Sequence, residues 1–165
     1  MDADQLSWAE RSGWRGGNGN GSRADLVLFF GARQALACGS RYHEMRALFP
    51  HAHILGCSTG GQILNDDVSD DEIDVLAMRF DATRLRLACE AAVAPEGSRT
   101  CGEAIGKTLA AEDLAGIFVL SGGLAGDGAK FQETLVGADC EPRKQRVAAI
   151  GFYGPSVRIG HGSAG

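Results

Sequence analysis

The sequence predicts a mixed α/β fold, a layered αβ sandwich in which helices flank a mixed β-sheet, and an incomplete domain. Three short apolar runs, at 26–30, 53–56 and 114–120, are typical of strands that are buried on both faces. Two longer stretches, at 32–49 and 98–112, have the apolar spacing of helices. This order of strands and helices favours a mixed sheet over a regular βαβ array.

The first 24 residues are predicted to form a flexible, glycine-rich N-terminal tail. Apart from Leu6, Trp8 and Trp14, they offer few side chains to a core, and 15–23 (RGGNGNGSR) consists of glycine and polar residues. A phosphate-binding glycine loop would need a preceding strand, which this stretch lacks. We therefore expect one ordered domain that covers residues 25–165.

The rest of the chain is predicted to be rich in strands. The stretches 73–80 and 85–93 are expected to pair as an antiparallel hairpin through the short connection 81–83. Further strands are expected at 146–153 and 156–160, and the second has barely begun where the sequence stops. The domain is therefore expected to be truncated at its C-terminus.

The composition is that of an ordinary globular domain, with 44% apolar and 22% charged residues. The net charge of -5 and the lack of a clustered basic surface exclude a nucleic-acid partner. No apolar run reaches the roughly 18 residues of a membrane span, and the N-terminus lacks the pattern of a secretory signal.

The five cysteines include no C-x-x-C pair, which is typical of a reducing compartment. Cys38, Cys57 and Cys89 lie among apolar residues, as reduced structural cysteines do. We therefore expect a cytoplasmic protein.

The candidate site consists of two places where an apolar strand runs into a glycine-rich turn, GCSTGGQI at 56–63 and SGGLAGDG at 121–128. Backbone N–H groups in such turns can bind anions, and ligands collect at the carboxyl ends of strands. The alternative is that both turns are only tight corners of the fold. The candidate ligand-binding residues are Cys57, Ser58, Thr59, Gly60, Gly61, Ser121, Gly122, Gly123, Gly126 and Asp127.

Two stretches of the sequence come close to nucleotide-binding motifs without matching them. GEAIGKT at 102–108 has too few residues between its glycines for a P-loop and lies inside a predicted helix. In GLAGDGAK at 123–130, an alanine separates the last glycine from the lysine. Neither stretch therefore predicts a nucleotide site.

Cys57 is the candidate nucleophile, because it lies where a strand gives way to a glycine turn. The nearest base, His53, is in the same strand and about 13 Å away at the rise of a strand. A buried, unreactive cysteine is therefore the preferred interpretation, and we expect no enzyme. A cysteine-dependent enzyme that uses Cys57 is kept as an alternative.

The histidines predict no metal site, since no cysteine or carboxylate lies at a matching interval from His51 and His53. Haem needs one axial ligand and an apolar pocket. His43 and His161 are the candidates for that ligand, and no local motif selects between them. The cofactor is therefore unknown, with haem as one option.

Taken together and in order, GCSTGGQI, GGLAGDG and the strands around them resemble the N-terminal segment of FIST domain proteins over residues 25–165. The resemblance implies a bacterial sensory domain for signal transduction, which binds an amino acid or a similar metabolite. Some members are similar to haem-binding nitric-oxide sensors that regulate a histidine kinase. A histidine kinase, another signalling protein or a second copy of the chain is therefore the expected partner.

The chain departs from the family pattern at both ends. Such proteins usually have a strand and a helix before the strand at 26–30, where this sequence has its glycine-rich tail. Their C-terminal half has no counterpart here. If the ligand site lies between the halves, this chain holds one wall of it, and a degenerate copy that binds nothing is the remaining alternative.

Overall fold

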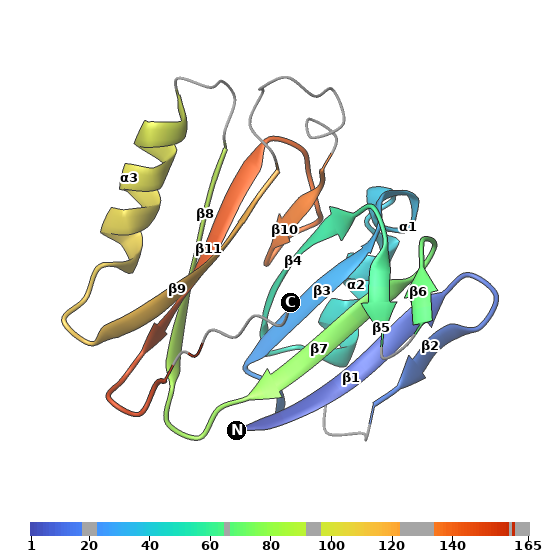
Figure 1. Cartoon of the computed structure of the whole chain (residues 1–165), viewed down its shortest axis with the longest axis horizontal. Helices are drawn as coiled ribbons and strands as arrows, with labels where there is room; N and C mark the ends of the chain where they lie inside the picture. Colours follow the sequence, from blue (N-terminus) through green and yellow to red (C-terminus); the bar gives the residue numbers. More distant parts are fainter. Residues whose placement is uncertain (18–22, 65–66, 92–96, 123–133, 159, 161–165) are drawn as a thin grey trace.

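The computed structural model describes residues 1–17, 23–64, 67–91, 97–122, 134–158 and 160. Its strands form a six-stranded, a three-stranded and a two-stranded sheet, with helices on the outer faces of the two larger sheets (Figure 1). This arrangement confirms the predicted mixed α/β class.

The six-stranded sheet is mixed because β3 (Leu26–Ala32) and β4 (His53–Thr59) are parallel while the other neighbours are antiparallel. These two central strands are the continuous apolar runs of the sequence, as expected for strands with both faces covered. The order of strands in the sheet is β10 (Val136–Ala138), β4, β3, β7 (Ile73–Arg79), β1 (Asp2–Ala9) and β2 (Gly13–Gly16).

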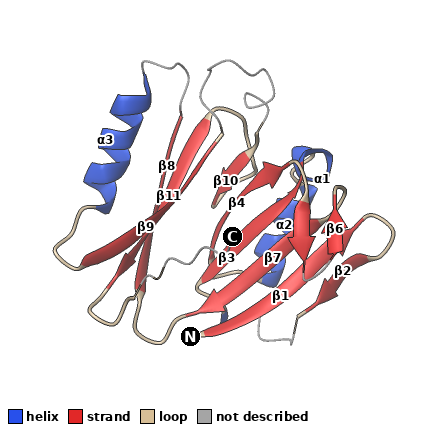
Figure 2. Cartoon of the chain, in the orientation of Figure 1, coloured by secondary structure: helices blue, strands red, loops and turns tan. Residues whose placement is uncertain are grey.

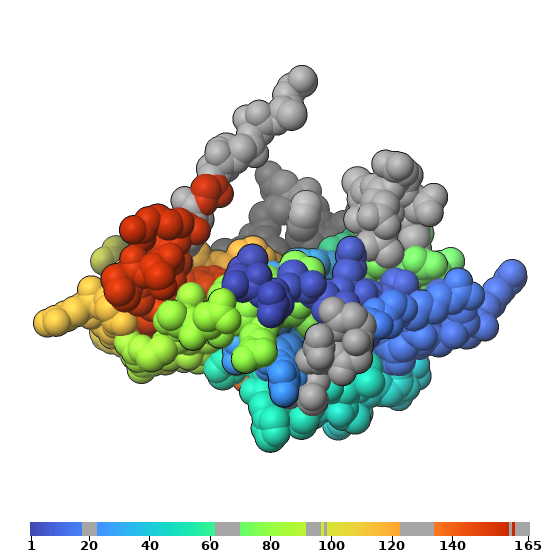
Figure 3. Space-filling view, turned by 90° about the horizontal axis from the view of Figure 1, so that it is seen from below, coloured from blue at the N-terminus to red at the C-terminus, as the bar shows by residue number. Residues whose placement is uncertain are grey.

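Two helices cover one face of this sheet, α1 (Arg33–Ala37) and α2 (Ser40–Leu48). The sequence predicts a single helix here, but Gly39 has a φ of 73°, a left-handed conformation that ends α1 and precedes α2. Leu36 and Met45 pack against Phe29 of β3 in one apolar core. Figure 3 shows α2 (cyan) along the lower side of the molecule, below the N-terminal strands (blue).

The opposite face of the six-stranded sheet packs against the three-stranded sheet, in the order β8 (Arg84–Ala91), β11 (Arg146–Tyr153) and β9 (Leu114–Ser121). On the far side of that sheet, α3 (Gly97–Leu109) buries Ile105 and Leu109 against Ala149 (Figure 2). The layers are therefore helix, sheet, sheet and helix. A small hairpin, β5 (Gln62–Leu64) and β6 (Asp67–Ser69), follows β4.

The prediction of a flexible tail is wrong for residues 2–16, because β1 and β2 are part of the six-stranded sheet. The few apolar side chains of this segment, Leu6, Trp8 and Trp14, pack against the helix-side core. The Trp14 indole N–H also donates to Glu44 at 2.7 Å, and the Arg41 guanidinium lies 4.5 Å from the Trp8 ring centre. The alternation of polar residues with these three apolar side chains is therefore the pattern of strands that are covered on one face.

The predicted hairpin of the strands now seen as β7 and β8 is also wrong, because the two belong to different sheets. Both edges of β7 are already paired, one with β3 and the other with β1. The chain therefore crosses at 80–83 to begin the second sheet.

Two further strand predictions need correction. The strand at 114–120 is not buried on both faces, because β9 is an edge strand whose residues Ile117 and Val119 are 43% and 53% exposed. Within the predicted strand 156–160, residues 156–158 and 160 form no strand. A strand is buried on both faces only where other layers cover both faces of its sheet, and a single-sequence pattern does not show those layers.

Candidate functional site

Side chains at the end of β4 alternate between the two faces of the six-stranded sheet. Cys57 faces the core between the sheets and is half-buried there. Burial raises the pKa of the Cys57 thiol to about 11, so the thiol is protonated near neutral pH. This environment opposes the formation of a thiolate nucleophile.

Ser58 points to the other face and has a structural partner. Its buried Oγ accepts a hydrogen bond from the Leu135 N–H at 2.9 Å, and its own N–H donates to the Leu135 carbonyl at 2.8 Å. These two bonds hold the chain that enters β10 against β4. The hydroxyl of Ser58 therefore has a structural role.

Thr59 and Gly61 line a hollow of about 450 Å³ on the sheet face that is turned away from α1 and α2. The hollow extends across four strands, β4, β3, β7 and β1, because Phe30 is in register with Asp74, and Gln5 with Leu76. Its lining residues are Gln5, Leu28, Phe30, Thr59, Gly61, Asp74, Val75 and Leu76. Two residues of the first predicted turn therefore belong to a real cavity.

Asp74 is the charged residue of this hollow, and the sequence analysis missed it. Its Oδ1 atom is buried and has no hydrogen-bond partner among the residues that the structure describes. Burial, and then the charge of Glu72, raises the pKa of this carboxyl group above its usual value. An acidic residue within the otherwise apolar run 73–78 was the available signal, since buried carboxylates normally have a partner.

Two residues of the second predicted turn are described, Ser121 and Gly122, and they lie away from this hollow. Ser121 is exposed at the end of β9, and the N–H of buried Gly122 donates to the Arg146 carbonyl at 3.0 Å. Neither residue lines the hollow at Thr59. Gly123, Gly126 and Asp127 lie outside the described residues.

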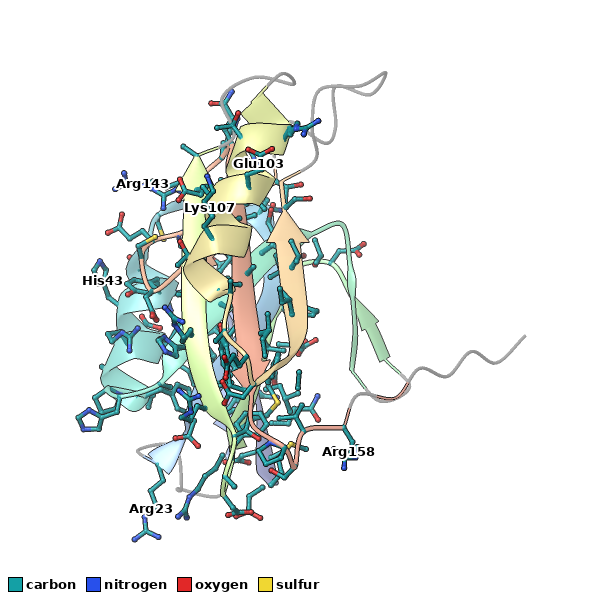
Figure 4. The ribbon with its side chains drawn as sticks, turned by 90° about the vertical axis from the view of Figure 1, so that its left-hand side faces the viewer. Arg23, His43, Glu103, Lys107, Arg143 and Arg158 are labelled. Atoms are coloured by element: carbon teal, nitrogen blue, oxygen red, sulfur yellow. The ribbon has the colours of Figure 1, made fainter. Side chains whose placement is uncertain are left out.

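The candidate haem ligands receive no pocket in the described part of the chain. His43 points outward from α2 (Figure 4), and its Nε2 lies 2.8 Å from Glu141 Oε1 in an exposed pair. His161 lies outside the described residues. Among the described residues, no three His, Cys, Asp or Glu side chains form a metal-binding group.

A second, apolar hollow of about 500 Å³ lies between the two large sheets. Met78, Phe80, Phe118 and Phe152 line it, and it shares Leu28 with the hollow at Thr59. The two cavities therefore adjoin on one face of the six-stranded sheet.

In the described part of the chain, no helix is long and apolar enough to cross a membrane. Comparison with curated proteins finds no match, and comparison with solved structures finds none either. Comparison with protein families matches the FIST N domain over residues 25–165. Since this match covers most of the sequence, the chain belongs to the FIST N domain family, a family of sensory domains in signal transduction.

Proposed function

We propose that this chain is a small-ligand-binding sensory domain whose hollow at the end of β4 takes a molecule with a protonated amine, such as an amino acid or a similar metabolite. The observation that carries the proposal is the buried Oδ1 of Asp74, which lacks a hydrogen-bond partner among the described residues. An ammonium group placed there would supply both a donor and the opposite charge.

The other walls of the hollow suit the rest of such a molecule. Thr59 and Gln5 bring neutral polar side chains, and Phe30 and Leu76 bring apolar surface. A volume of about 450 Å³ suits a small metabolite. A ligand held by Asp74 and Thr59 would link β7 to β4 across β3, and we infer that a signalling protein, such as a histidine kinase, responds to this linkage.

The proposal is tested by thermal unfolding with matched pairs of compounds: alanine with propanoate, leucine with 4-methylpentanoate, and phenylalanine with 3-phenylpropanoate. A ligand at 100 times its Kd adds about 2.7 kcal/mol to the free energy of unfolding. We expect an amino acid to raise the melting temperature while its partner without the amine does not. Equal effects of both members of every pair would refute the role of the amine.

Two variants locate the effect. Asp74→Asn keeps the size of the side chain but removes its charge, and it should abolish the stabilisation by the amino acid. Asp71→Asn removes a charge from an exposed position three residues away and should leave it unchanged. Stabilisation that survives in Asp74→Asn would place the ligand elsewhere.

The haem and enzyme alternatives are tested on the same protein. The raised pKa of Cys57 and the exposed pairing of His43 with Glu141 do not favour either. A Soret band on haem titration that is lost in His161→Ala would replace the amine proposal with a haem sensor. An activity that is lost in Cys57→Ser would replace it with an enzyme.

A further inference from the structure

Away from the hollow at Thr59, one guanidinium group lies between two thiols. Arg146 Nη1 donates to the Cys140 sulfur at 3.3 Å and to the Cys89 sulfur at 3.7 Å. Cys89 is in β8, Cys140 follows β10, and Arg146 begins β11. The fold therefore brings Cys89 next to Arg146, 57 residues further along the chain, and next to Cys140, which is six residues from Arg146.

The two sulfurs are close enough to react after a small movement. Since both distances end on the same nitrogen, the sulfurs are at most about 7 Å apart, compared with about 2 Å in a disulfide. Cys140 lies in a bend between two non-glycine residues with positive φ, Asp139 at 51° and Gln145 at 56°. The approach of the two sulfurs leaves the pairing of β8 with β11 in place, because Cys140 lies outside both strands.

We propose that Cys89 and Cys140 are an oxidation site, which hydrogen peroxide converts into an intrachain disulfide. The proposal goes beyond ligand sensing, because neither cysteine lines the hollow at Thr59. Both cysteines are partly exposed, whereas Cys101 is a buried residue of α3, on the other face of the three-stranded sheet. The geometry thus selects one pair among the five cysteines.

The reaction takes place in two steps. The sulfur of Cys140, as thiolate, attacks one peroxide oxygen, so that an S–O bond forms, the O–O bond breaks, and sulfenic acid and hydroxide result. The sulfur of Cys89 then attacks the Cys140 sulfur, and the S–OH oxygen leaves as water with the thiol proton. Two thiols lose two electrons in total, and peroxide is reduced to two molecules of water.

Arg146 is the positioning residue of this site. A cation beside a sulfur favours the thiolate, which is the form that attacks an oxidant. Burial raises the pKa of Cys89 in spite of the opposing charge of Arg146, so Cys89 is a poor nucleophile for the first step. The finished bond would join β8 of one sheet to the bend that follows β10 of the other, so it would cross-link the two sheets.

The test oxidises the full chain with one equivalent of hydrogen peroxide, blocks the remaining thiols with iodoacetamide and identifies the digested peptides by mass. We expect one cross-linked pair that contains Cys89 and Cys140, and a higher melting temperature that dithiothreitol reverses. Cys140→Ser should abolish the cross-link and leave Cys89 open to alkylation. Alkylation of both cysteines in the oxidised wild-type chain, or a cross-link to another cysteine, would overturn the proposal.

A matched pair of arginine variants tests the role of the guanidinium. Arg146→Gln should slow the appearance of the cross-link roughly tenfold. Arg143→Gln removes an exposed charge from the same connection and should not change the rate. Equal rates in both variants would remove Arg146 from the site, and circular dichroism of each variant establishes that it is folded.

Discussion

At the scale of single residues, the glycines of the first predicted turn have different structural roles. A Cβ at Gly56 would overlap the carbonyl oxygen and the ring of Phe29, so only glycine fits this point of β4. A Cβ at Gly60 would meet nothing within 4 Å, and Gly60 has no positive φ. The sequence analysis treated both as parts of one turn, because the contact with Phe29 lies between strands and leaves no local pattern.

Gly56→Ala should therefore be strongly destabilising, while Gly60→Ala should fold normally. The overlap at Gly56 is with backbone as well as with a side chain, so a loss on the order of 3 kcal/mol in the free energy of unfolding is expected. Urea denaturation of both variants measures it. Similar midpoints for Gly56→Ala and the wild type would show that Phe29 moves aside.

The cysteines differ in reactivity, and one of them corrects the sequence analysis. Cys38 is exposed at the end of α1, not surrounded by apolar residues. Hydrogen bonds from the Ser40 side chain and backbone lower its pKa, and the charge of Arg41 adds to this effect. Cys38 should therefore be alkylated first by iodoacetamide at neutral pH, and Cys57 among the last. A time course followed by peptide mass would contradict this order if Cys57 reacted before Cys38.

The raised pKa of Asp74 predicts an effect on the free energy of unfolding that does not depend on any ligand. Because the folded state raises the pKa of this acid, its ionised form costs stability above the raised pKa, and the cost disappears as the pH falls to the ordinary value of 3.8. Asp74→Asn should therefore stabilise the ligand-free protein at pH 7, by on the order of 1 kcal/mol. Urea midpoints measured from neutral to acid pH should converge. A variant that is less stable at neutral pH would indicate that Asp74 has a partner.

At the scale of elements, Asp139 fastens the end of β10 to its neighbours. Its carboxylate accepts hydrogen bonds from His53 Nδ1 at 2.7 Å, from Arg46 Nη2 at 2.7 Å and from the Ile54 N–H at 2.8 Å. The bonds join α2, β4 and the bend after β10. Nothing in the local sequence of this bend predicts them, because two of the three donors belong to β4 and the third to α2.

Asp139→Asn should therefore destabilise the protein by roughly 1–3 kcal/mol at pH 7. Burial alone would raise the pKa of Asp139, but the bonds from His53 and Ile54 and the charge of Arg46 lower it overall. The stabilisation is thus present above the ordinary value of 3.8 and is lost as the pH falls through the lowered pKa. Wild type and variant should have converging urea midpoints in acid, and a constant difference across pH would contradict this linkage.

The elements that the sequence predicted well are those whose pattern is local. β3, β4 and β11 are continuous apolar runs, and α3 has regular helical spacing. Partners were harder to predict than elements, since the pairing of β7 with β1 joins residues at opposite ends of a long stretch of chain. The sequence predicted only part of the hollow for the same reason. Thr59 and Gly61 belong to the predicted turn, whereas Asp74 and Gln5 come to lie near them only because their strands pair in the sheet.

At the scale of the whole molecule, the N-terminal segment determines whether the six-stranded sheet is complete. β1 covers the edge of β7 over seven residue pairs, and Gln5 forms part of the hollow. Leu6, Trp8 and Trp14 close the side of the helix-facing core. The sequence analysis predicted a flexible tail because the segment has few apolar residues, yet a strand that is covered on one face needs only a few, correctly spaced.

Deletion of residues 1–17 should therefore cost stability and the ligand site together. Loss of three partly buried side chains removes on the order of 3 kcal/mol of apolar burial, and the bare edge of β7 would favour aggregation. The measurements are soluble yield, the urea midpoint and amino-acid stabilisation. Glu10→Ala with Arg11→Ala, in the exposed turn between β1 and β2, is the matched control and should behave as wild type. An unchanged urea midpoint in the deletion variant would show that the segment is a tail, because a strand that contributes to the core cannot be removed without loss of stability.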